Sequence, residues 1–293
     1  MKKVYISAYP FMCGMEDKTF EFRTACEKLP MDLLINELKE YNPDGIIAGL
    51  ETYDRSIFKL CPNLKVISRV GSGIDNIHLK DAEEFGIKVL NTPFEPVQAV
   101  AELVIAQIIN LLRHIPKYHK FDKLFNNKVL GKNLSDCTVG IIGYGNIGKK
   151  VAQLLRPFGT KLLIHDINFD IGTKPLDFVL ENSDIVTLHI PLNPPNNVKF
   201  FNRWKFEHMK EGSFLINTSR GAVVDEADLY KFLTNGHLAG AALDVFETEP
   251  YNGVLRFLPN VLATPHIGSS TVGARKAMEM KAFENIVQFL LNV

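Results

Sequence analysis

The segment Thr138-Val139-Gly140-Ile141-Ile142-Gly143-Tyr144-Gly145-Asn146-Ile147-Gly148 decides the fold of this chain. A short β-branched run leads directly into the pattern Gly143-x-Gly145-x-x-Gly148, and apolar residues at helical spacing follow it. A strand, a glycine-rich turn and a helix in this order are the context of a dinucleotide-binding fingerprint. The first glycine permits the tight turn, the second lets the backbone approach a pyrophosphate, and the third lets the helix pack on the strand. A glycine-rich turn in an ordinary βαβ unit is the alternative.

The acidic residue that such a fingerprint needs is also present. Asp166 follows the next expected strand and lies close to the offset of roughly 20 residues at which a carboxylate hydrogen-bonds the adenosine ribose. A carboxylate there repels a 2′-phosphate, so the sequence favours NAD over NADP. A solvated aspartate at a strand end is the alternative.

Strand and helix patterns alternate along the whole chain. After residue 136 we expect six strands, at 138–142, 161–165, 185–189, 213–217, 239–243 and 261–264. Residues 1–92 contain four more, at 4–7, 45–48, 64–68 and 87–90, with helices such as 31–41 and 79–85 between them. This alternation predicts an α/β protein with a Rossmann doubly wound parallel sheet and a second, smaller α/β domain. We assign no structure to residues 11–19.

A long apolar helix is expected between the two sets of strands. The breaker-rich junction at residues 91–96 precedes it, and it runs from about Val97 to His114. Apolar residues cover most of its circumference, which predicts burial in the core, between domains or against another subunit.

Composition bounds the class of protein. The chain has 293 residues, of which 46% are hydrophobic, and this length favours two domains. Its 33 basic and 33 acidic residues cancel, so we expect neither nucleic acid nor a membrane surface as a partner. The four cysteines form no CxxC pair, so we expect free thiols in the cytoplasm and no metal site. No apolar run is long enough for a membrane span.

The ends of the expected strands gather the candidate catalytic residues. Ligands of open α/β sheets bind beyond the carboxyl ends of the strands, where Arg220, Glu249 and His266 lie. Histidine suits the proton exchange at an oxygen whose carbon gains or loses a hydride. A carboxylate beside it orients the imidazole and favours its protonated form. Arginine polarises a carbonyl and binds an adjacent carboxylate.

Each of these three residues also has a structural interpretation. Arg220 could form a surface ion pair, Glu249 could lie in a solvated turn, and His266 could cap a loop. Their joint placement at successive strand ends favours the catalytic interpretation. We expect the cofactor to contact the turn and the strand ends at Gly143, Gly145, Asn146, Ile147, Gly148, Asp166, His189, Pro191, Thr218, Ser219, Asp244, His266 and Gly268.

A candidate substrate loop lies in the first part of the chain. The run Arg69-Val70-Gly71-Ser72-Gly73 follows an expected strand, and its glycines can expose consecutive backbone N–H groups to an anion such as a carboxylate. A structural turn is the alternative.

From about residue 63 to residue 285 the chain resembles the D-isomer-specific 2-hydroxyacid dehydrogenase family. The motifs VGIIGYGNIG, HIPL, INTSRGAVVDE, ALDVFETEP and TPHIGSST stand in the family's order and spacing. The resemblance implies that Arg220 binds the substrate carboxylate and carbonyl, that His266 is the general acid/base and that Glu249 is its partner. It also implies that Asp244 contacts the nicotinamide carboxamide, and that the loop at residues 70–74 receives the substrate carboxylate together with Arg220 and His266.

The resemblance also implies a domain layout. Residues 1–92 with 269–293 would form a flavodoxin-like substrate domain, and 93–268 the NAD-binding domain, with catalysis in the cleft between them. Such relatives are usually homodimers built around the helix after Pro96.

Within the family the segment SRVGSGIDNI is most similar to the D-3-phosphoglycerate dehydrogenases, and Arg69 stands where a phosphate-binding arginine is expected. Glyoxylate/hydroxypyruvate reductases share most of these residues and remain an alternative. An NAD(H)-sensing, corepressor-like binding protein is an alternative of another class.

Overall fold

The computed structural model describes residues 1–14, 18–115, 129–168, 173–193 and 195–293. Part of the segment 11–19, to which no structure was assigned, therefore lies outside the described residues. The chain divides into two compact units, one of Met1–Pro96 with Ser269–Val293 and one of Val97–Gly268. The first boundary falls after Pro96, whereas the sequence placed it after residue 92.

The first unit is built on a five-stranded sheet in the order β2-β1-β3-β4-β5, in which every pair is parallel. Its strands are β1 (Lys2–Ile6), β2 (Phe20–Thr24), β3 (Gly45–Ala48), β4 (Val66–Arg69) and β5 (Lys88–Leu90). This is the flavodoxin-like order, as predicted. The edge strand β2 was not among the predicted strands.

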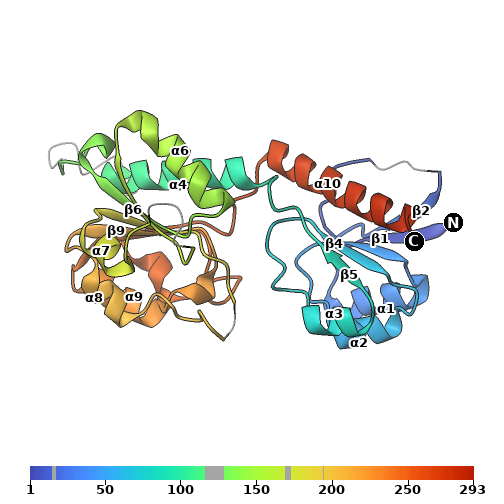
Figure 1. The fold of residues 1–293 in the computed structure, drawn as a ribbon. Coiled ribbons are helices and arrows are strands. Elements are labelled where there is room, and N and C mark those ends of the chain that lie inside the picture. Colours follow the sequence, from blue (N-terminus) through green and yellow to red (C-terminus); the bar gives the residue numbers. More distant parts are fainter. Residues whose placement is uncertain (15–17, 116–128, 169–172, 194) are drawn as a thin grey trace, which may run out of the picture. The chain divides into compact units, whose positions relative to one another are not determined.

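Alternating side chains give this sheet two apolar faces. Ile46 packs with α1 (Met31–Tyr41), α2 (Arg55–Leu60) and α3 (Leu79–Glu84), whereas Ile47 packs on the other face. The other face is covered by α10 (Val272–Leu291), whose Met278, Ala282, Ile286 and Leu290 are buried there (Figure 1). The core of the first unit thus needs a helix that lies far away in the sequence.

The second unit is built on a six-stranded parallel sheet in the order β11-β10-β9-β8-β6-β7. Its strands are β6 (Thr138–Ile142), β7 (Lys161–His165), β8 (Ile185–Leu188), β9 (Ser213–Asn217), β10 (Leu238–Leu243) and β11 (Val261–Ala263). All six were predicted, with ends that differ by one residue at most. The strand order reverses beside β6, and this switch point is where open α/β sheets bind ligands.

Helices cover both faces of the second sheet, as the doubly wound prediction requires (Figure 1). The α4 (Val97–Leu112) and α6 (Asn146–Leu155) helices pack on one face. The other face carries α7 (Leu176–Glu181), α8 (Arg203–His208) and α9 (Glu226–Thr234). Short 3-10 turns are η2 (Leu134–Asp136), η3 (Arg156–Phe158), η5 (Gly221–Val223) and η6 (Val254–Phe257).

Apolar residues cover most of the circumference of α4, but the helix buries only one side against the sheet. Val104, Ile108 and Leu111 belong to the core of the second unit, whereas Leu103 and Ile109 are half-buried. The helix ends at Leu112, two residues before the expected end at His114.

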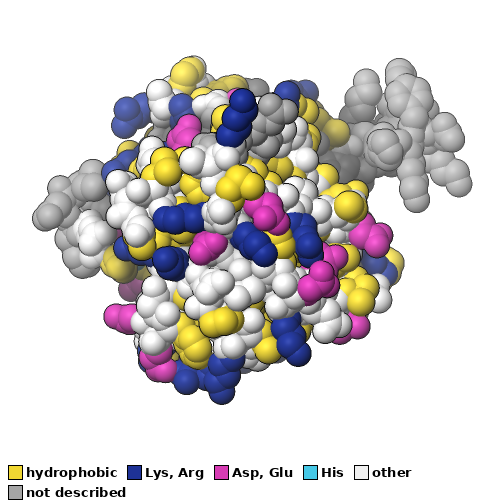
Figure 2. Space-filling model, turned by 90° about the vertical axis from the view of Figure 1, so that its right-hand side faces the viewer, with side chains coloured by type: hydrophobic (Ala, Val, Ile, Leu, Met, Phe, Trp, Pro, Cys, Tyr) yellow, Lys and Arg dark blue, Asp and Glu magenta, His cyan; other side chains and the backbone are white. Residues whose placement is uncertain are grey.

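Three further features of the described residues concern membrane helices, metal ligands and surface charge. None of their helices combines the length and apolar character that crossing a membrane requires. No group of three potential metal ligands lies together among them. Figure 2 shows one face, on which basic and acidic side chains of the described residues are interspersed rather than separated by sign.

Candidate active site

The glycine-rich turn has the conformation that the fingerprint requires. Gly143 has φ +93° and lies against the carbonyl of His189, which a Cβ at Gly143 would approach to 2.6 Å. At Gly148 a Cβ would lie 2.1 Å from the carbonyl oxygen of Gly143, so only glycine lets α6 begin so close to the turn. Gly145 has open space where its Cβ would be. The tight turn at Gly143 and the close packing at Gly148 are therefore present as expected, and Gly145 leaves room for the predicted pyrophosphate.

The residues around this turn fit a dinucleotide. The α6 helix begins at Asn146 after its N-cap residue Gly145, and no side chain caps it. The first N–H groups of the helix, including that of Ile147, are therefore available to a phosphate. The hydroxyl of Thr218, after β9, is buried without a hydrogen-bond partner among the described residues. A buried hydroxyl of this kind needs a partner, which a ligand at the strand ends can supply.

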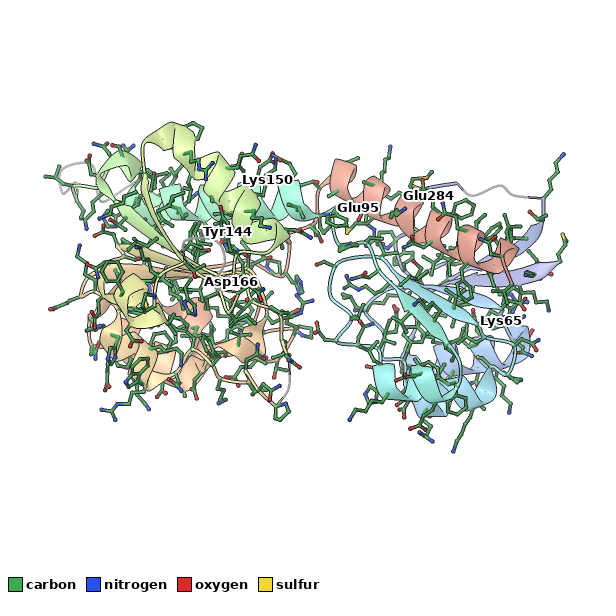
Figure 3. All side chains as sticks on the ribbon, viewed as in Figure 1. Lys65, Glu95, Tyr144, Lys150, Asp166 and Glu284 are labelled. Carbon is green, nitrogen blue, oxygen red and sulfur yellow. The ribbon has the colours of Figure 1, made fainter. Side chains whose placement is uncertain are left out.

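Asp166 has a structural role that the sequence did not reveal. Its Oδ2 accepts a hydrogen bond from the Tyr144 N–H at 2.6 Å, and its Oδ1 accepts one from the Asn168 N–H at 2.9 Å. Figure 3 shows Tyr144 and Asp166 close to each other at the ends of β6 and β7. A carboxylate can accept about four hydrogen bonds, so two positions remain for a ribose diol.

His189 and Pro191 follow β8 at the same edge of the sheet. The His189 N–H donates to Ile142 O at 2.8 Å, and its Nε2 lies 3.0 Å from the Thr187 hydroxyl. Burial lowers the pKa of His189 to about 3, so its imidazole is neutral at physiological pH. His189 therefore supports the glycine-rich turn and is not a proton donor.

Asn217 organises the loop that carries Arg220. This fully buried residue accepts hydrogen bonds from the Ser219 N–H and hydroxyl at 3.0 and 2.8 Å, and it donates to Arg220 O at 3.0 Å. The Arg220 guanidinium in turn donates to Ser219 O at 2.8 Å. The backbone of this arginine is thus fixed by the side chain of Asn217.

Glu249 and His266 form a close pair. Nδ1 of His266 lies 2.8 Å from Oε2 of Glu249, which leaves Nε2 of the imidazole for a substrate. Burial raises the pKa of Glu249, but the hydrogen bond from His266, the Phe246 N–H and the charge of Arg220 outweigh it, so the pKa lies below its ordinary value. The structure therefore brings Arg220, Glu249 and His266 into one electrostatic cluster.

The loop around His266 is held by Asp244. His266 has φ +53°, a left-handed conformation that is uncommon for residues other than glycine. Asp244, which is 1% exposed, accepts hydrogen bonds from the Ile267 and Gly268 N–H groups at 2.8 and 2.7 Å and from the Thr264 hydroxyl at 2.6 Å. The His266 N–H donates to the Asp244 carbonyl. Three of about four acceptor positions of this carboxylate are used inside the loop, which leaves one for the expected nicotinamide contact.

The candidate substrate loop of the first unit has fewer available N–H groups than the sequence indicated. The Val70 N–H donates to Ala48 O at 2.9 Å, and the Gly71 N–H donates to the Thr92 hydroxyl at 2.7 Å. These two groups are already used by the fold. The N–H groups of Ser72 and Gly73 have no partner among the described residues, so an anion can reach only this later part of the run.

Arg69 ends β4 and folds over the same loop. A Cβ at Gly71 would lie 1.5 Å from Nη1 of Arg69, so the guanidinium occupies the space beside that glycine. This places a positive charge next to the residues that carry the unused N–H groups.

Sequence reasoning did not single out several residues that shape the site. Asn217, Thr92 and Asn91 act through hydrogen bonds to the backbone of the functional loops, and Thr264 acts through a hydrogen bond to the Asp244 carboxylate. Their positions after strand ends were visible in the sequence, but the identity of their partners depends on the fold.

Comparisons with known proteins agree with this geometry. Residues 105–268 match the family model of the D-isomer specific 2-hydroxyacid dehydrogenase, NAD binding domain. The chain is 35% identical to a hydroxypyruvate reductase of Thermotoga maritima over 92% of each chain. It is 34% identical to a D-3-phosphoglycerate dehydrogenase of Dictyostelium discoideum, over 94% of this chain and 71% of that one.

Solved structures extend the likeness to the whole fold. The D-lactate dehydrogenase of Aquifex aeolicus, in complex with NAD and lactic acid, superposes with a TM-score of 0.83 at 26% identity and covers 99% of this chain and 96% of its own. The family match, the relatives and the NAD-binding features of the second unit lead to one conclusion. The chain belongs to the D-isomer-specific 2-hydroxyacid dehydrogenase family and is an NAD-dependent oxidoreductase.

Proposed function

We propose that this enzyme interconverts a short D-2-hydroxy acid and its 2-keto acid, with D-3-phosphoglycerate as the leading substrate. The single observation that carries the choice of substrate is the position of Arg69. Its guanidinium lies over Gly71, beside the unused N–H groups of Ser72 and Gly73. A second anionic group on the substrate, such as a phosphate, would find a cation next to the carboxylate site.

His266 is the proposed general acid/base. With Nδ1 engaged by Glu249 at 2.8 Å, Nε2 is the nitrogen that gives a proton to the C2 oxygen during reduction or removes it during oxidation. The ionised Glu249 keeps the imidazole oriented and stabilises its protonated form. NAD, when bound, carries the hydride that C2 gains or loses.

Arg220 is proposed to bind the substrate carboxylate and to polarise the C2 carbonyl. Its backbone is held by Asn217, and its guanidinium is oriented by Ser219 O, so little reorganisation is needed when the substrate binds. In the first unit, Ser72 and Gly73 would offer two backbone donors to a substrate carboxylate.

Hydroxypyruvate or glyoxylate is the second candidate substrate. It is supported by the hydroxypyruvate reductase that covers 92% of this chain at 35% identity. These smaller acids need the carboxylate site and Arg220 but no partner for a phosphate.

The substrate class is tested by following NADH oxidation with a panel of phosphorylated and unphosphorylated 2-keto acids. We expect turnover, and we expect Arg69→Ala to raise the KM for phosphohydroxypyruvate about tenfold or more while changing the KM for hydroxypyruvate little. Equal losses for both compounds would remove the reason to prefer the phosphorylated one.

The role of Arg220 is tested with Arg220→Ala. We expect kcat/KM to fall about 100- to 1,000-fold, because a charged contact to the developing oxyanion is lost. Arg256→Ala, at an arginine of η6 whose guanidinium packs on the Phe257 ring, is the matched control and should leave activity unchanged. NADH binding without turnover by the unaltered protein would instead favour a nucleotide-sensing, corepressor-like protein.

A further inference from the structure

The side chain of Asn91 holds the backbone of the substrate loop. Asn91 directly follows β5, and its Nδ2 donates to the carbonyl oxygen of Ser72 at 2.6 Å. Ser72 is the residue whose peptide group connects to Gly73, one of the two unused donors.

A second asparagine supports the first. Asn285, on α10, donates from Nδ2 to the Asn91 carbonyl at 3.2 Å and lies 3.3 Å from the Ser68 hydroxyl on β4. In Figure 1, α10 runs across the face of the sheet that contains β4. The backbone of Asn91 is therefore held by α10, while its side chain reaches the loop.

The geometry of the peptide bond connects this contact to the proposed anion site. The Ser72–Gly73 peptide is trans and planar, so its C=O and N–H point in opposite directions. A fixed direction for the Ser72 oxygen therefore fixes the direction of the Gly73 N–H. Glycine offers little resistance to rotation of this peptide plane, so an external anchor is needed to hold it.

We propose that Asn91, braced by Asn285, is a positioning residue that keeps the Gly73 N–H aimed at the substrate carboxylate. This inference rests on the proposed function, in which Ser72 and Gly73 receive that carboxylate. The hydrogen bond to the Ser72 oxygen also polarises the same peptide unit, which strengthens its N–H as a donor. Asn91 itself does not touch the substrate.

The experiment compares Asn91→Ala with the unaltered enzyme, using oxamate as a probe of 2-keto acid binding. We expect the inhibition constant of oxamate and the KM for the best keto acid to rise about tenfold, with kcat changed less than about twofold, because a binding contact is lost in both ground and transition state. The Kd of NADH, which is bound by the second unit, should stay the same and serves as a check of folding.

Two further variants and a control separate positioning from a general structural effect. Asn91→Asp keeps the size but faces the Ser72 oxygen with an acceptor, so its loss of oxamate binding should exceed that of Asn91→Ala. Asn285→Ala should give a smaller loss of the same kind. Asn292→Ala removes a comparable Nδ2 contact, to Gln288 O at 2.8 Å on the exposed end of α10, and should have no effect.

The methyl ester of the keto acid gives a readout that a structural role would not move. It lacks the carboxylate, so Asn91→Ala should lower kcat/KM for the acid much more than for the ester. Equal losses for the two compounds, or unchanged oxamate binding in an enzyme that turns over keto acids, would overturn the positioning role alone. Absence of both turnover and oxamate binding in the unaltered protein would overturn the proposed function and this inference with it.

Discussion

Individual side chains in the candidate site are fixed by several specific contacts each. Glu249 is the clearest case, because its pKa is lowered by His266, Phe246 and Arg220 in spite of burial. A lowered native pKa means that Glu249 contributes to folding stability fully above its ordinary value of 4.5, and that this contribution is lost as the pH falls through the native value. At neutral pH the carboxylate is therefore ionised and available to His266.

Replacing this charge should change the pH profile. In Glu249→Gln the amide can still bond to Nδ1 of His266, but it no longer stabilises a protonated imidazole. Reduction of the keto acid needs that proton, so kcat/KM for reduction should fall about tenfold. Steady-state kcat/KM from about pH 5 to 9 measures the change. Glu211→Gln, at an exposed position, is the control, and identical profiles for all three proteins would contradict the pairing.

The candidate residues could be predicted from the sequence, but the hydrogen bonds that their backbone and side-chain groups make within the fold could not. The run at residues 70–74 was predicted as a whole to receive a carboxylate. Val70 and Gly71 donate to Ala48 and Thr92, and these partners come from other parts of the chain. Asp166 likewise bonds Tyr144 and Asn168 through the turn it lies beside. Such contacts depend on the register of neighbouring strands, which no single motif contains.

Helices and strands were easier to predict from the sequence than these individual contacts. All six strands of the second unit were predicted, because each is an apolar run bounded by turn residues. In the first unit β2 was missed, since Phe20-Glu21-Phe22-Arg23-Thr24 is a short edge strand with one buried face. The short α2 was missed as well, although Asp54 caps it through the Ser56 N–H. Short elements give little periodicity to detect.

The junction between β6 and α6 allows a matched pair of substitutions. Gly148→Ala would bring a Cβ to 2.1 Å from Gly143 O, whereas Gly145→Ala meets nothing within 4 Å. We expect Gly148→Ala to lower the free energy of unfolding by about 1–3 kcal/mol and to weaken NADH binding. Gly145→Ala should leave stability nearly unchanged and still weaken NADH binding, because the added methyl intrudes where the pyrophosphate approaches. Urea denaturation and fluorescence titration measure both; unchanged NADH affinity in the two variants would contradict the assignment.

At the scale of the whole molecule we propose a homodimer. The half-buried Leu103 and Ile109 on α4 form the apolar side that the core of the second unit does not use. Sedimentation should give about twice the 33.0 kDa of the chain. Ile109→Lys should shift the distribution toward the monomer, whereas Glu181→Lys, at an exposed position of α7 on the opposite face of the sheet, should not. A single species at the monomer mass in the unaltered protein would end this proposal.

The α10 helix lies far in the sequence from the sheet that it covers, and this affects folding during synthesis. The second unit is one continuous stretch and can acquire its structure as soon as its last strand has left the ribosome. The first unit is synthesised earlier but has an uncovered apolar sheet face until α10 emerges. During that interval the nascent sheet is the part of the protein most exposed to chaperones and to aggregation. Codons that slow translation before Val272 would prolong the exposure of this apolar face without altering any amino acid.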